Sequence, residues 1–157
     1  MTTDPDPIER RLALARRFTE QVPHNQALGL VVEALRDRTA RFRLPYHPKL
    51  IGNPATGVLH GGAITSLLDG CAGAAVFATL TELQPIATLD LRIDYLRPAE
   101  PGRDVVAEAT CHHTSKHVAF VRALAFHADD EAPIATAVGT FMIGTKLGTN
   151  RAARGGA

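Results

Sequence analysis

Residues 51–80 read IGNPATGVLHGGAITSLLDGCAGAAVFATL, and this stretch decides the fold that the sequence predicts. Its proline and clustered glycines indicate an irregular loop up to the histidine. From Ala63 onward the only helix-weakening residues are Gly70 and Gly73, which a helix tolerates at about 1 kcal/mol each. A helix from about Gly62 to Ala78 would be roughly 25 Å long. It would be apolar around most of its circumference, so we expect it to be a buried central helix.

One acid, Asp69, interrupts the apolar surface of this helix. Thr65 and Ser66 lie one turn before it on the same face, so the three residues form a narrow polar stripe. A buried carboxylate needs partners, which leaves two interpretations, a structural ion pair or a reactive acid in a site. The helix N-terminus favours the reactive acid, because its free backbone N–H groups can stabilise an oxyanion. Glycines at positions 61 and 62 would let a substrate carbonyl approach that backbone.

The sequence LHGG, followed by an apolar helix with an acid nine residues after the histidine, resembles the hotdog-fold acyl-CoA thioesterases. Within this family it is most similar to the PaaI-like (phenylacetyl-CoA thioesterase) branch. The segment TLDLRIDYLRPA at 88–99 resembles the strand that follows the helix in that family. The resemblance extends over about residues 25 to 145. It implies an α+β hotdog fold and a homodimer, in many members a homotetramer, with active sites at the subunit boundary.

The resemblance also implies hydrolysis of an acyl-CoA to the free acid and CoA, with coenzyme A present only as part of the substrate and with no metal. Asp69 would be the general base or the nucleophile. The backbone N–H of Gly61, helped by Gly62 and the helix dipole, would polarise the thioester carbonyl. His60 would bond the leaving sulfur or only fix the loop.

Further positions match the family by type and order. Asn53 would assist at the carbonyl or hold water, although it lies seven positions before the histidine where the family has six. Thr88 would position water. Arg97, Lys116 and His117 match basic positions near which family members hold the phosphates of CoA, while solvated turn charge is the simpler interpretation of all three.

Around the central helix the sequence predicts one further helix and about six strands. DPIE at 6–9 has the features of a helix start. Strand patterns cover 30–35, 39–44, 89–95, 103–111, 118–128 and 134–143. We expect one domain over 6–145, with flexible tails at 1–5 and 146–157. A curved antiparallel sheet wrapped around one apolar helix would bury every apolar face.

The strand at 89–95 has apolar residues at its odd positions, which predicts one half-buried face. This parity places Thr88 on the face of Asp90. By the resemblance, 89–96 would pair with the same strand of a second subunit, which would also cover an exposed sheet edge. The histidines of CHHTSKH, at 111–117, fit a polar turn between strands better than a metal site.

Composition narrows the choice of function. The chain has 157 residues, of which 45% are hydrophobic and 21% are charged, as in an ordinary globular protein. Its formal charge is +1, and it has no stripe of basic residues of the kind that would indicate nucleic-acid binding. Cys71 and Cys111 fall in apolar runs, as reduced core cysteines do. The central helix is too short and interrupted for a membrane span, and MTTDPDPIERR lacks the apolar region of a secretory signal. We therefore expect a cytoplasmic protein without membrane association.

Three other functions stay open at this point. They are a hydratase or dehydratase on the same fold, a non-catalytic acyl-CoA-binding module, and an interaction protein in which Asp69 is only an ion-pair partner. The sequence is compatible with aryl, medium-chain and longer acyl groups.

Overall fold

The structure of the protein is a computed structural model that describes residues 7–145, apart from the side chains at positions 7, 11, 130 and 131. The tails expected at 1–5 and 146–157 lie outside the described residues. In chain order the elements are α1 (Pro7–Glu20), α2 (Pro23–Leu28), β1 (Val31–Arg36), β2 (Thr39–Leu44), the 3₁₀ turn η1 (Pro48–Leu50), β3 (Ile51–Asn53), β4 (Val58–Leu59), α3 (Gly61–Thr79), β5 (Ile86–Tyr95), β6 (Val105–Thr114), β7 (Val118–His127) and β8 (Asp130–Ile143).

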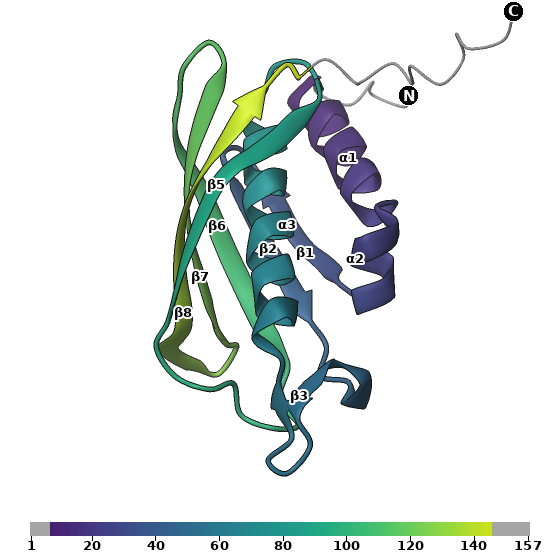
Figure 1. Cartoon of the computed structure of the whole chain (residues 1–157). Helices are drawn as coiled ribbons and strands as arrows, with labels where there is room; N and C mark the ends of the chain where they lie inside the picture. The colour runs from purple at the N-terminus through teal and green to yellow at the C-terminus, as the bar shows by residue number, and fades with distance from the viewer. Residues whose placement is uncertain (1–6, 146–157) are drawn as a thin grey trace, which may run out of the picture.

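Six of the strands form one antiparallel sheet in the order β1-β2-β6-β7-β8-β5, and β3 pairs separately with β4. The sheet curves around α3, and α1 lies on the other side of that helix (Figure 1). Helix α3 contacts all six strands of the sheet, while α1 packs on α3 and β1. The expected hotdog fold, a curved sheet around one long central helix with an extra N-terminal helix, is confirmed.

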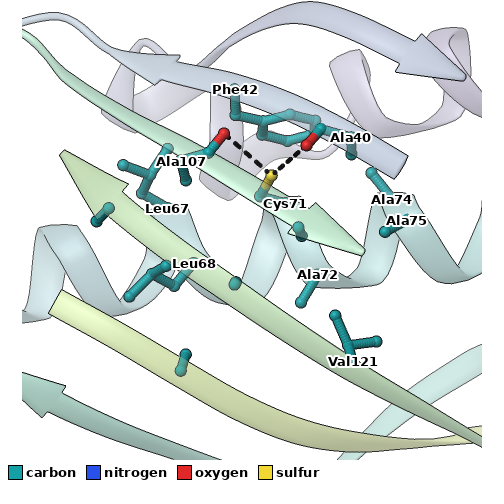
Figure 2. Close-up of a cluster of buried hydrophobic side chains, with 14 of the residues drawn as sticks. Ala40, Phe42, Leu67, Leu68, Cys71, Ala72, Ala74, Ala75, Ala107 and Val121 are labelled. Atoms are coloured by element: carbon teal, nitrogen blue, oxygen red, sulfur yellow. Dashed lines mark hydrogen bonds between the residues drawn. The ribbon is translucent and has the colours of Figure 1, made fainter. Parts of the chain in front are cut away.

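Helix α3 forms the core of the molecule. By length and composition α3 could cross a membrane. However, 67% of its apolar 18-residue stretch is buried inside the protein, as expected of a helix that forms a protein core. Leu67 and Leu68 are fully buried, and burial of each such side chain contributes about 1.5–3 kcal/mol. Cys71 lies between β2 and β6, where its thiol donates to the main-chain oxygens of Ala40 at 3.4 Å and Ala107 at 3.5 Å (Figure 2).

A bulge in β5 changes which residues face α3. The pairing with β8 shifts between Thr88 and Asp90, so the residues before and after this point do not follow one alternation. Leu89 is consequently 52% exposed, whereas Thr88 contacts α3 and lines the same cavity as Leu91. The prediction that Thr88 shares a face with Asp90, and Leu89 with Leu91, is therefore wrong.

The two ends of the sheet order are β1 and β5, so β5 is the edge strand that the sequence analysis expected. The short elements α2, η1, β3 and β4 were not predicted. The turn in CHHTSKH is also shorter than expected, because β6 continues to Thr114. His112 and His113 therefore belong to a strand and not to the turn.

Candidate active site

A cavity of about 550 Å³ lies between the N-terminal helices, α3, β5 and β8. Thr65, Ser66 and Asp69 line it from α3, so the polar stripe predicted from the sequence faces one cavity. Its size falls in the range of about 300–1,000 Å³ that is typical of small-molecule sites. The cavity brings the acid together with a largely apolar wall.

Asp69 is half-buried in this cavity and is held by one residue of β5. The Thr88 hydroxyl donates a hydrogen bond to Asp69 Oδ1 at 2.9 Å. Within residues 7–145 Asp69 takes part in no ion pair and its second oxygen has no hydrogen-bond partner. The arrangement gives no support to a structural ion pair and leaves one carboxylate oxygen available to a ligand.

His60 is the N-cap of α3. Its backbone is extended, with φ −63° and ψ 133°, and its Nδ1 accepts a hydrogen bond from the Gly62 N–H at 2.9 Å. An accepting Nδ1 places the proton of a neutral ring on Nε2, which can then donate to a ligand. A Cβ at Gly62 would lie 2.9 Å from the His60 ring nitrogen, so a larger residue there would require this ring to move.

The capping bond decides which amide is available at the helix N-terminus. The Gly62 N–H is occupied by the His60 ring. The Gly61 N–H has no hydrogen-bond partner in the part of the chain that the structure describes. Of the two glycines expected to face a carbonyl, Gly61 therefore has the free donor.

Gly61 lines a second cavity of about 350 Å³, together with Tyr95 and Arg97. The Tyr95 hydroxyl donates to the Gly61 oxygen at 2.8 Å and lies 2.7 Å from Thr65 Oγ1. Arg97 donates to the Ala132 oxygen at 2.7 Å. Tyr95 was not among the predicted site residues, although a tyrosine at the end of a predicted edge strand was the available signal.

The predicted site residues of one chain are divided between two places. Gly61 and Asp69 are about two turns of α3 apart, or roughly 12 Å along its axis, and they line different cavities. Asn53 is exposed in β3, where its Oδ1 accepts from the Ala55 N–H at 3.0 Å, and it lines neither cavity. One chain thus brings Asp69 and Thr88 together, but it does not bring them to Gly61, His60 or Asn53.

The three basic residues expected at CoA phosphates are divided in the same way. Lys116 and His117 are exposed in the turn between β6 and β7. The His117 oxygen accepts from Ile143 N–H at the C-terminal end of β8. The Arg97 N–H instead bonds to Ile134 near the opposite end of that strand. Arg97 therefore lies far from Lys116 and His117 within one chain.

The short helix α2 adds polar groups to the larger cavity that the sequence analysis missed. His24 Nε2 lies 3.0 Å from Ser66 Oγ, and both residues line the cavity beside Asp69. Asn25 is buried and donates to the Thr19 oxygen at 3.1 Å. The available sequence signal was PHN at 23–25, because proline is favoured at the first position of a helix.

The histidines of β6 contact an aromatic ring. The rings of His112 and His113 pack against Phe120 at 6.5 and 5.7 Å between centroids. Partial burial, followed by the charge of Arg122, lowers the pKa of His112. Within the described residues no group of three or more His, Cys, Asp or Glu side chains is arranged to hold a metal ion.

Comparison with known proteins decides the family. The sequence profile described as Thioesterase superfamily matches residues 56–134, which include α3, β5, β6 and β7. The chain belongs to the thioesterase superfamily. Among relatives in this superfamily, the medium/long-chain acyl-CoA thioesterase YigI of Salmonella typhimurium is 36% identical over 140 residues, which cover 81% of this chain and 89% of YigI.

Several solved structures share the fold of this chain. A Pseudomonas aeruginosa protein of 46% identity matches with a TM-score of 0.76 over 84% of this chain and 98% of its own. A mutant form of the phenylacetic acid degradation protein PaaI of Thermus thermophilus is 26% identical with a TM-score of 0.68, over 77% of this chain and 98% of its own. The resemblance to PaaI-like thioesterases is thereby confirmed.

Proposed function

We propose that this member of the thioesterase superfamily is an enzyme that hydrolyses medium- and long-chain acyl-CoA to the free acid and CoA. The observation that carries the proposal is the Asp69 carboxylate, held by Thr88 on the wall of a largely apolar cavity with one oxygen free. The name of the YigI relative supports the chain length. Coenzyme A is part of the substrate, and the reaction needs no further cofactor.

The complete site forms between two subunits that pair through β5. Two antiparallel β5 strands related by a twofold axis place the C-terminal end of one strand against the N-terminal end of the other. The Gly61 and Tyr95 end of one subunit then meets the Asp69 and Thr88 end of the second subunit. The same operation brings Arg97 of one subunit toward Lys116 of the other, where both charges can face the phosphates of CoA.

Pairing through β5 is favoured by the edge itself. Within the described residues β5 bonds to β8 on one side only, and an unpaired edge is a template for another strand. We propose a homodimer as the active unit, with assembly into a dimer of dimers as a further step. Analytical ultracentrifugation measures both states, and a monomer with full activity would contradict the shared site.

In the reaction, the thioester carbonyl accepts a hydrogen bond from the Gly61 N–H, which stabilises the negative oxygen that develops on attack. As a general base, Asp69 takes a proton from water, the hydroxide adds to the carbonyl carbon, and the carbon–sulfur bond breaks to release the CoA thiolate. As a nucleophile, Asp69 instead attacks the carbonyl carbon and expels the CoA thiolate to form an anhydride, which water then hydrolyses to the free acid and the Asp69 carboxylate. The Thr88 hydroxyl orients the carboxylate in either route.

Replacement of the acid tests the function. Asp69→Asn keeps the size of the side chain and an oxygen for Thr88, but it removes the base or nucleophile. We expect release of free CoA thiol from acyl-CoA to fall about 10²–10⁴-fold, with an unchanged circular dichroism spectrum and sedimentation. Tight binding without turnover by the unmutated protein would favour an acyl-CoA-binding module, and hydration of an enoyl-CoA would favour a hydratase.

The state of the two cysteines indicates the cellular compartment of the protein. Cys71 and Cys111 are both free and buried, and unpaired thiols are the usual state in a reducing compartment. We propose the cytoplasm, which is such a compartment, as the location of this enzyme. Fractionation with an antibody against the native protein checks it.

A further inference from the structure

Two contacts between the N-terminal helices and α3 mark the length of the larger cavity. Near one end, His24 of α2 hydrogen-bonds Ser66 at 3.0 Å. The other contact lies about three turns later on α3, roughly 16 Å along the axis. There the rings of Phe18 and Phe77 meet edge to face, with 5.3 Å between centroids and an interplanar angle of 73°. All four residues line the cavity.

The cavity changes from polar to apolar along this length. Asp69, Thr88 and the His24 pair gather toward its first end. Beyond Asp69 the wall consists of small or apolar residues from α3, β5 and β8, namely Gly73, Ala74, Phe77, Ile86 and Phe141. A site that is polar at one end and apolar at the other fits a ligand with the same division, such as a thioester followed by an alkyl chain.

Gly73 keeps the middle of the cavity open. A Cβ at this position would meet only Ile86 Cδ1 at 3.7 Å and Phe141 Cε1 at 3.8 Å, both at ordinary van der Waals distance. An alanine is therefore compatible with the fold, and the glycine is not required by backbone crowding. Because glycine has no side chain, space remains in the part of the cavity between Asp69 and Phe77.

We propose that the acyl chain lies along α3 from Asp69 toward Phe77, beneath α1, and that the Phe18–Phe77 pair sets the longest chain that the site accepts. This inference rests on the proposed thioesterase function and names its specificity residues. Phe77 is the fixed wall, because it belongs to the core helix. Phe18 is 55% exposed on α1, so a longer chain can pass only by displacing this ring into solvent.

Binding measurements on an Asp69→Asn background test the inference without turnover. The dissociation constants of straight-chain acyl-CoAs, from hexanoyl-CoA to palmitoyl-CoA, are measured by calorimetry. Each methylene that enters the cavity should tighten binding about fourfold, equivalent to about 0.8 kcal/mol, until the chain reaches Phe77. Beyond that length the dissociation constant should stop falling.

Variants at the far end and in the middle of the apolar section should move this limit in opposite directions. Phe77→Ala and Phe18→Ala should each move it to longer chains, and Gly73→Leu to shorter ones. Gly73→Ala, whose methyl group fits the fold, should weaken the longest bound chains while the melting temperature stays the same or rises, because alanine favours a helix more than glycine does. A limit at the same chain length in all these variants, or affinity independent of chain length, would overturn the inference.

Phe120→Ala is the matched control, because it removes the same ring at a half-buried position outside the cavity. It should leave the limit where it is, and a shift equal to that of Phe77→Ala would also overturn the inference. Thiol release by the unmutated protein is measured with the same acyl-CoAs. Absence of turnover contradicts the proposed function, whereas turnover with an immovable chain-length limit contradicts only the role of the two phenylalanines.

Discussion

The Tyr95 hydroxyl lies 2.8 Å from the main-chain oxygen of Gly61, and this hydrogen bond ties the edge strand β5 to the first turn of α3. The same hydroxyl reaches Thr65 Oγ1 at 2.7 Å. The two contacts fix the end of α3 that carries the free Gly61 amide. We therefore infer that Tyr95 is a positioning residue, since it holds the backbone of the proposed oxyanion donor.

Tyr95→Phe keeps the ring and removes both contacts. We expect kcat/KM for acyl-CoA to fall about tenfold, or about 1.4 kcal/mol of transition-state stabilisation, because the oxyanion donor is held less precisely. Stability should fall by about 1 kcal/mol in urea unfolding. Tyr46→Phe is the control, since the Tyr46 hydroxyl donates a similar bond to the Gly57 oxygen at 2.8 Å outside this cavity. Equal loss of activity in both variants would exclude a special role for Tyr95.

Gly61→Pro removes one amide hydrogen with little change in structure. Gly61 is the first residue of α3, a position where proline is favoured because its missing N–H has no helical partner. The preceding His60 already has the extended backbone that a following proline requires. We expect kcat to fall about 10²–10³-fold, as for loss of other oxyanion donors.

Gly61→Ala is the control for that change, because it keeps the N–H while adding the same Cβ, 3.4 Å from the Tyr95 hydroxyl. It should retain most of the activity, with both variants folded by circular dichroism. If alanine abolishes activity as fully as proline does, the lost amide is not the cause.

The Cys71 thiol gives a prediction about pH. Burial raises its pKa well above the ordinary value of 9.0. In the unfolded chain the thiol ionises above about pH 9, while in the folded protein it stays protonated. The contribution to stability is thus fully present below that pH and is lost as the pH rises further, by about 1.4 kcal/mol per pH unit.

Urea unfolding at several pH values above 9 measures this loss in the unmutated protein and in Cys71→Ala. The alanine variant lacks the ionising group, so its stability should fall less steeply with pH. Parallel curves would contradict the assignment. The same burial predicts that Cys71 does not react with thiol reagents in the native protein, which keeps the background of a CoA-release assay low.

The architecture was predictable because each element carries its own pattern. The apolar circumference of α3 and the alternation in the strands are local features, so the fold could be inferred from them. The edge position of β5 was implied by the resemblance to the hotdog thioesterases and not by a local pattern. Asp69 was identified for the same reason, as one acid in an apolar helix. The bulge at Thr88–Asp90 was not predictable, since no glycine marks it and the strand reads as regular alternation.

The site was harder to predict than the fold, because its geometry depends on contacts between distant segments. No local pattern places Thr88 against Asp69, or assigns the Gly62 amide to the His60 ring. The spacing along α3 did predict that Gly61 and Asp69 are two turns apart. The spacing does not specify that each of these residues lines a different cavity. This separation is the reason to look for the other half of the site in a second subunit.

A shared site can be tested by mixing two inactive subunits. In a heterodimer of Asp69→Asn with Gly61→Pro, one of the two sites combines the intact Gly61 of the first subunit with the intact Asp69 of the second. Random pairing of equal amounts gives about half heterodimers, each with one working site, so co-expression should restore about a quarter of the normal activity. The measurement is kcat of the unfractionated mixture, and heterodimers isolated through a different affinity tag on each variant should reach about half of the normal value. If the site instead required Gly61 and Asp69 of the same chain, no subunit in the mixture would carry both residues intact. The activity of the mixture would then stay at the level of the separate variants.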